Sequence, residues 1–249
     1  MKTKLYKAAV SFLIPVVFWI SVWWLISKLI DFSFIFPTPN ETIAAFFALL
    51  FTKNFVLSVI FSLFRIILGF ALGVALGISV AILTNKFSLL RSIISPVMVV
   101  LKSTPVASFI MILWFFFSSN NIPVIIAIFM VMPVIWQSTT DGLCAINSEL
   151  AEVCETFSFP FKKKMKLLIF PSVLKFLLPA VISSSGLAWK AGVAAEIITY
   201  TRLSLGELIY NAKLSLDGPF LFATTCAVVI LSLIIEALIK FLLGRVKKV

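Results

Sequence analysis

Apolar residues run along this chain in stretches that exceed what the core of a soluble domain requires. Residues 8–27 are all uncharged, and further long apolar stretches follow, separated by short polar segments. About 20 consecutive apolar residues form a helix that is long enough to cross the hydrocarbon core of a bilayer. The apolar core of a secretory signal is shorter, at about 7 to 15 residues. The pattern therefore predicts an all-α membrane protein with an uncleaved first span.

The apolar stretches divide into six predicted membrane helices. Residues 103–140 hold no charge, a run too long for one helix, and the polar residues 118–121 break it in two. Pro96, Pro105 and Pro133 lie within these spans, so kinks are expected there. A connector with a turn at 36–40 and a short surface helix over 41–51 follows the first span. The predicted spans cover 8–27, 56–83, 93–117, 122–140, 173–199 and 219–243.

The positions of the cations indicate how these helices are oriented. Of the 21 Lys and Arg residues, 14 lie in segments on one side of the predicted membrane, 4 on the other side and 3 within spans. Lysine and arginine accumulate in cytoplasmic loops. Both termini are therefore predicted to be cytoplasmic, which requires an even number of spans. This orientation accounts for the formal charge of +11, and no nucleic-acid partner is expected.

The composition excludes several kinds of chemistry. Hydrophobic residues make up 61% of the chain and charged residues 12%, whereas about a quarter of the residues of a soluble domain are charged. The chain has no histidine and its three cysteines form no CxxC pair, so no catalytic residue and no metal site are predicted. None of its nine glycines precedes a lysine, which excludes a P-loop. No cofactor is expected on this chain, and any ATP is expected to bind another subunit.

Three glycines recur at a spacing of four residues within the second predicted span. Gly69, Gly73 and Gly77 lie on one face of that helix. Glycine is frequent in membrane helices in general, but two consecutive GxxxG steps are typical of a face that another helix approaches closely. We predict close helix packing along this face.

Charged residues inside the predicted spans are candidates for function, because a charge is costly in a bilayer. Lys190 and Glu196 lie in the fifth span, six residues apart and so on different faces of the helix. Lys190 could attract an anion in a transport pathway, and the alternative is a hydrogen bond or ion pair with another helix. Trp189 is included in this candidate pathway, although tryptophan more often packs or anchors a helix. Arg65 is expected to bind a carboxylate or backbone carbonyl groups.

The polar segment 141–171 contains a pattern of fixed spacing. Residues 152–171 read EVCETFSFPFKKKMKLLIFP, which resembles the EAA loop of binding-protein-dependent ABC importer permeases, written E-A-A-x3-G-x9-I-x-L-P. Ser158 stands at the glycine position, so it must avoid a positive φ or bear strain. A basic loop that merely orients the protein needs no such spacing. The resemblance implies a loop that docks an ATPase through Glu152, Val153, Cys154, Ser158, Phe159, Pro160, Phe161 and Pro171.

The resemblance covers about residues 36–243 and is closest to the nitrate, sulfonate and taurine type of importer permease. It rests on FPTPNETIAAFFALL, SLFRIILGFALGVALGISVAIL, LKSTPVASFIMILWF, GLAWKAGVAAEII and SLGELIYNAKLSLDGPFLFA. It implies a type I ABC importer permease fold with a permease domain over 55–243 that contains a coupling loop at 141–171. A helix and external connector over 1–54 precede this domain, and a basic cytoplasmic tail over 244–249 follows it.

The resemblance also implies partners and a mechanism. The chain would be the multi-pass permease subunit of an ATP-driven importer in the bacterial inner membrane, paired with a second permease copy. Two copies of a cytoplasmic ABC ATPase would hold ATP and Mg²⁺, and an extracytoplasmic binding protein would deliver the substrate. Relatives carry sulfonate, nitrate or taurine-like anions, or vitamin-precursor heterocycles. Glu196, near the outer end of its span, would mark an external gate or the contact with the binding protein.

Two other classes of protein are compatible with a multi-span chain. An ion- or proton-coupled secondary transporter would need carboxylates inside the membrane, for which Glu196 and Glu236 are the only candidates. This alternative leaves the docking loop unexplained. A membrane enzyme would need a nucleophile and a base, and the sequence offers no convincing pair.

Overall fold

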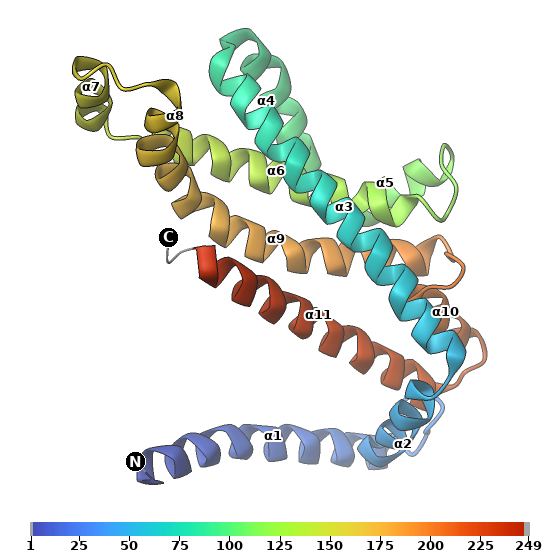
Figure 1. Ribbon diagram of the computed structural model, residues 1–249. Helices are drawn as coiled ribbons and strands as arrows, with labels where there is room; N and C mark the ends of the chain where they lie inside the picture. Colours follow the sequence, from blue (N-terminus) through green and yellow to red (C-terminus); the bar gives the residue numbers. More distant parts are fainter. Residues whose placement is uncertain (1, 247–249) are drawn as a thin grey trace.

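The computed structural model describes residues 2–246, with side chains described over 13–244, and its regular structure over this range is entirely helical. The side chains of Lys2, Lys4 and Lys7 and most of the predicted basic tail at 244–249 lie outside the described residues. The helices (Figure 1) are α1 Lys2–Ile30, α2 Pro39–Leu50, α3 Lys53–Lys86, α4 Ser88–Ser103, α5 Val106–Trp114, α6 Ile122–Cys144, α7 Ser148–Thr156, α8 Phe161–Lys164, the π-helix η1 Met165–Ile169, α9 Phe170–Ile198, α10 Leu205–Leu214 and α11 Gly218–Val246.

Five helical segments of the described chain are long and apolar enough to cross a membrane, and the bent pair α4 and α5 makes a sixth when it is taken as one span. Side-chain caps fix the starts of α2, α3, α7 and α10. Helix α2, for example, begins at a capping box in which Thr38 and Glu41 bind each other's backbone N–H groups. The prediction of an all-α membrane fold is confirmed. The predicted number of six spans is met when α4 and α5 are counted together as one span.

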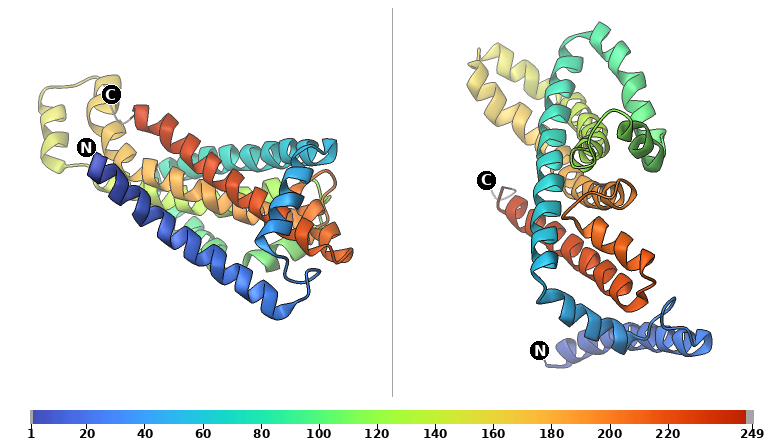
Figure 2. Two further views of the ribbon diagram at one scale, coloured as in Figure 1. Left: turned by 90° about the horizontal axis from the view of Figure 1, so that it is seen from below. Right: turned by 90° about the vertical axis from the view of Figure 1, so that its right-hand side faces the viewer.

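Helix α6 forms the centre of the bundle and packs along its length against both α3 and α9 (Figures 1 and 2). The largest buried cluster joins these three helices through Ile66 of α3, Val131 and Ile135 of α6, and Val193 of α9. Such a continuous apolar contact between helices fixes their positions relative to one another. The remaining spans attach around this three-helix centre.

The glycine face of α3 is the surface that α6 approaches. Gly69, Gly73 and Gly77 are all buried, and a Cβ atom added at Gly73 would lie only 2.8 Å from the Cβ atom of Val131. Ala127 and Ile135 lie equally close to the other two glycines. The predicted close packing is confirmed, because side chains at these positions would push the two helices apart.

The prediction of one continuous third span over 93–117 is wrong. The chain instead forms α4 and α5, which meet at an angle of 104°. Thr104 has extended backbone angles and Pro105 follows it at the N-terminus of α5. The ring of a proline disfavours helical angles in the preceding residue, and proline has no N–H for a helical hydrogen bond. Pro105 therefore ends α4, whereas α4 and α6 continue through Pro96 and Pro133.

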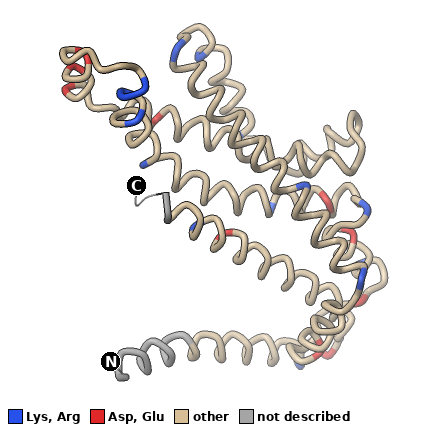
Figure 3. Tube along the Cα trace, in the orientation of Figure 1, with Lys and Arg blue, Asp and Glu red and all other residues tan. Residues whose placement is uncertain are grey.

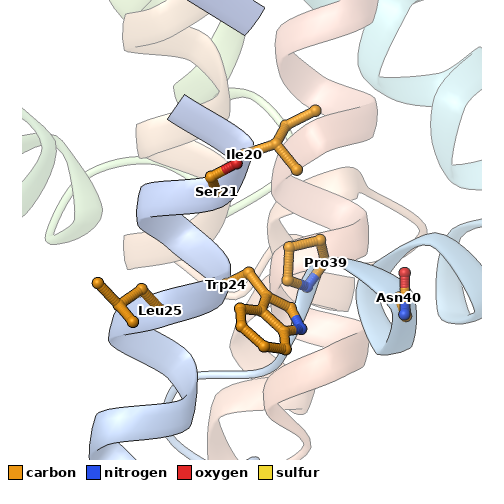
Figure 4. A pocket seen from close by; sticks show the side chains of 6 residues that line it. All are labelled: Ile20, Ser21, Trp24, Leu25, Pro39 and Asn40. Carbon is orange, nitrogen blue, oxygen red and sulfur yellow. The ribbon is translucent and has the colours of Figure 1, made fainter. Parts of the chain in front are cut away.

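Helix α1 lies at the edge of the bundle and is attached mainly at its outer end. Trp23 donates from Nε1 to the carbonyl oxygen of Pro37 at 3.0 Å, and its ring stacks on Phe222 of α11. Next to this contact Trp24 and Pro39 line a recess of about 470 Å³ between α1 and α2 (Figure 4). Over the described side chains of α1, residues 13–30, most positions are exposed.

The loop that carries α7 and α8 lies at the same end of the molecule as the start of α1 and the end of α11 (Figures 1 and 2). Basic residues collect at this end, on the α8 segment and around the turn between α3 and α4 (Figure 3). This arrangement agrees with the cation distribution along the sequence. A cytoplasmic location for both termini stays a prediction.

Candidate functional site

Helix α7 and the turn after it form a rigid unit with defined ends. Asn147 caps the start of α7 by accepting from the Leu150 N–H at 3.1 Å. At the other end the Ser158 N–H donates to the Glu155 carbonyl oxygen and the Phe159 N–H to that of Cys154, each at 2.9 Å. These two bonds define a Schellman motif, which ends a helix with one residue in the left-handed region. The polar loop is therefore preorganised.

Ser158 is the residue in the left-handed region, with φ of 49°. It therefore adopts the conformation that glycine favours. Of the two alternatives expected for a serine at this position, it has the positive φ and bears the backbone strain. For a residue with a Cβ atom this conformation costs about 1 to 2 kcal/mol. The turn thus has at Ser158 the backbone conformation that a glycine would adopt more easily.

Replacing Ser158 by glycine is expected to stabilise the protein by about 1 kcal/mol, because it removes the Cβ clash at positive φ. The melting temperature of the purified protein in detergent should rise by about 2 to 4 °C. Ser158→Val should lower it, because a branched Cβ tolerates this conformation poorly. Ser215→Gly is the matched control at a helix end with φ of −81°, and a gain there as large as at Ser158 would contradict the explanation.

The exposed surface of this loop is apolar at its tip and charged along its sides. Phe157 and Phe161 are each 70% exposed, whereas Phe159 is half-buried under Lys163, whose Nζ lies 4.0 Å from the ring centroid. An ion pair of 3.1 Å between Lys164 and Glu155 ties α8 to α7. Two exposed phenylalanines on a braced turn form a surface that a partner protein can cover.

The structure sorts the predicted docking residues into surface and interior positions. Glu152 and Val153 are exposed on α7. Cys154 belongs to the same predicted docking loop, but its side chain is buried within it, and its role in docking stays a prediction. Pro160 precedes the first residue of α8 and Pro171 lies in the first turn of α9. Phe157 was missed, and its sequence signal is a large aromatic residue at the end of an otherwise polar helix.

The loop is joined to the membrane part by unbroken helix. From Phe161 the chain continues through η1 into α9 as one helical run that ends at Ile198. In η1 the Phe170 N–H donates to the Met165 carbonyl oxygen, five residues back, and the buried Leu168 anchors this turn. A displacement of α8 is thus transmitted directly to α9.

The two neighbouring candidates of the predicted pathway differ in their surroundings. Trp189 is 1% exposed and its Nε1 donates to the Val228 carbonyl oxygen of α11 at 3.0 Å. Trp189 therefore packs between helices, and its assignment to the pathway stays a prediction. Lys190 is exposed on α9, without a hydrogen bond or ion pair among the described residues. Lys190 therefore remains available for a ligand or for another chain.

Glu196 is the centre of a buried polar cluster at the end of the bundle that is predicted to be the outer one. Its side chain is 0% exposed, and its Oε2 accepts from Ser62 Oγ at 2.7 Å and from the Gly206 N–H at 3.4 Å. Ser62 Oγ in turn accepts from the Leu205 N–H at 3.0 Å. Oε1 lies 3.7 Å from Nη1 of Arg65. We call Ser62, Arg65 and Glu196 the outer polar cluster, and it joins α3, α9 and the start of α10.

Arg65 extends this cluster to two loops. Its guanidinium group donates to the carbonyl oxygens of Leu203 at 3.2 Å and Arg202 at 3.1 Å, and to Asn120 Oδ1 at 3.1 Å. The expectation that Arg65 binds a carboxylate and backbone carbonyls is confirmed. Because Glu196 is enclosed by these groups, it presents no surface to a soluble partner.

Long apolar helices around a close-packed centre, with a braced loop continuous with one of the spans, define a multi-span membrane protein. The chain belongs to the family of binding-protein-dependent transport system inner membrane components, whose model matches residues 73–248. The family is a component of transport systems and not a family of enzymes. The match includes the loop with α7 and α8 and every span from α4 onward.

Two comparisons add detail. The chain is 28% identical over 102 residues to the putative aliphatic sulfonates transport permease protein SsuC of Bacillus subtilis (strain 168), a match that covers 41% of this chain and 36% of that protein. It thus spans only about a third of the length of that relative. A crystal structure of an amino acid ABC transporter with histidines has a TM-score of 0.63 at 16% identity, over 80% of this chain and 94% of the other. This similarity supports the fold.

Proposed function

We propose that this chain forms the translocation pathway of an ATP-driven importer that carries a small sulfonate-like anion across the bacterial inner membrane. An extracytoplasmic binding protein delivers the substrate, and two permease copies bind two copies of a cytoplasmic ATPase, which hold ATP and Mg²⁺. The observation that carries the proposal is the braced loop 148–164, whose exposed tip continues through η1 into α9. Closing of the ATPase subunits would move α9 through this connection.

The substrate class follows from the intramembrane charge and from the relative. Lys190 is an exposed cation on a membrane helix, and a cation held in a span favours an anion in a water-filled pathway. The name of the B. subtilis relative refers to aliphatic sulfonates, which are anions. Taurine and nitrate share this charge, and a vitamin-precursor heterocycle is the alternative cargo.

The secondary-transporter alternative has less support. Of its two candidate carboxylates, Glu196 is enclosed in the outer polar cluster, and Glu236 is paired with Lys240 one turn away on α11. A coupling carboxylate must exchange its ion during each cycle. In this structure each of the two carboxylates would have to give up an existing interaction before it could exchange an ion.

The docking surface is tested at its two exposed phenylalanines. Phe157→Asp with Phe161→Asp is expected to reduce co-purification of the ATPase and ATP-driven uptake at least tenfold, because two charges replace the apolar contact. Phe87→Asp is the control, since Phe87 is also exposed and lies at the turn between α3 and α4. Unchanged ATPase binding in the double variant would overturn the docking role. Glu152→Lys extends the test to the acidic side of α7.

A further inference from the structure

Helix α5 is held on one side only. Ile110 and Leu113 are buried in a small cluster that includes Ala191 and Ala195 of α9. The opposite face is exposed, as at Met111. Ile122 and Ile126 of α6 and Ile198 of α9 belong to the same cluster, so the packing of α5 is apolar and confined to this one face.

The inner end of α5 has the features of a hinge. Between α4 and α5 the helix direction changes by 104°. Pro105 supplies no N–H, and no side chain caps the start of α5. Hinges are formed by a few residues at element ends that absorb changes in φ and ψ. A change at Thr104 alone would therefore reorient all of α5.

The outer end of α5 leads into a turn that two hydrogen bonds connect to other parts of the described chain. Thr201 Oγ1 donates to the Ser119 carbonyl oxygen at 2.9 Å, and Arg65 donates to Asn120 Oδ1 at 3.1 Å. Both bonds link the turn to the loop between α9 and α10, directly or through Arg65. We call these two bonds the outer latch.

Both bonds of the latch can open without leaving a buried group unpaired, because the hydroxyl of the buried Thr201 also lies 2.9 Å from Thr199 Oγ1. Asn120 is exposed, so water can replace its bond to Arg65 when the turn moves away. Arg65 would keep its bonds to Arg202 and Leu203. Breaking the bonds of Glu196 would instead leave buried polar groups without partners, which is costly. Movement of α5 would therefore open the latch and leave the outer polar cluster intact.

We propose that α5 is a movable outer segment of the transport pathway, hinged at Thr104 and Pro105 and released at each cycle by opening of the outer latch. Arg65 and Thr201 are positioning residues that hold the segment in the closed arrangement. The inference rests on the proposed importer function and adds to it which element moves on the outer side. Transport then requires the turn at 118–121 to separate from the loop at 199–204.

A reversible cross-link tests this requirement. In a background with Cys144→Ser, Cys154→Ala and Cys226→Ala, the pair Ser119→Cys and Thr201→Cys is joined by a disulfide or by a short bis-thiosulfonate reagent. The complete transporter in proteoliposomes is then assayed for ATP-driven uptake, before and after addition of a reductant. The control pair is Tyr200→Cys and Asn211→Cys, which joins the same loop to α10 across an existing 3.0 Å hydrogen bond without touching α5.

Locking the latch is expected to reduce uptake at least tenfold, with recovery on reduction, whereas the control cross-link should change uptake by less than twofold. Recovery on reduction shows that the substitutions themselves do not damage the fold. Uptake within twofold of the reduced level in the locked protein would overturn the inference while leaving the importer function intact. Absence of ATP-driven uptake before cross-linking would overturn the importer function itself, and the inference with it.

Discussion

Replacing Gly73 by leucine is expected to prevent α3 and α6 from packing and so to abolish recovery of folded protein. A Cβ atom at this position already lies 2.8 Å from Val131 Cβ, and that atom is too close to the helix backbone to rotate away. Overpacking costs about 1 to 3 kcal/mol in a well-packed core and occasionally more. A whole isobutyl group in the middle of the central contact belongs at the upper end of this range. Size-exclusion chromatography in detergent should show aggregate in place of the folded peak.

The matched control is Gly244→Leu on the exposed inner end of α11, where an added Cβ atom meets nothing within 4 Å. This variant should give the yield and melting temperature of the unchanged protein. Gly73→Ala should fall between the two, because only one carbon atom is added. A folded, thermally unchanged Gly73→Leu protein would show that α3 and α6 separate easily and would contradict the close-packed centre.

The parts of the fold that sequence predicts well are those that depend on local repetition. The glycine spacing in α3 is such a signal, because a period of four places all three residues on one face whatever the surroundings. The length of each apolar stretch likewise predicts a span. The break at Pro105 was anticipated only as a kink, because continuous hydrophobicity across 103–117 gives no sign that Thr104 becomes extended.

The contacts of individual site residues depend on the packing of distant segments. Ser62 and Glu196 are 134 residues apart in sequence, and no local pattern pairs them. Trp189 and Lys190 are neighbours in sequence, yet one packs against α11 and the other is exposed. The rotation of α9 relative to α11 decides which of them faces a pathway, and that rotation follows from side-chain packing over the whole bundle.

Replacing Glu196 by leucine is expected to destabilise the protein by about 3 to 5 kcal/mol, as removal of one partner of a buried ion pair does. Ser62 would lose the acceptor for its hydroxyl, and Arg65 would lose its only carboxylate within ion-pair distance among the described residues. The start of α10 would lose one of its attachments to α9, because the Gly206 N–H also donates to Glu196. The measurement is the melting temperature together with the yield of assembled transporter.

Glu196→Gln separates the hydrogen bonds from the charge, because its amide oxygen can still accept from Ser62 and Gly206. It should cost about 1 to 3 kcal/mol, less than the leucine variant, through the lost interaction with Arg65. Glu236→Leu removes an exposed carboxylate that is paired with Lys240 at i, i+4 on α11, and such a pair contributes about 0.3 to 0.5 kcal/mol. A melting temperature for Glu196→Leu as high as that for Glu236→Leu would exclude the outer polar cluster as the element that joins α3 to α9 and α10.

The Arg65→Met and Glu196→Leu double variant should be less destabilised than the sum of the two single changes, because it leaves no single buried charge without a partner.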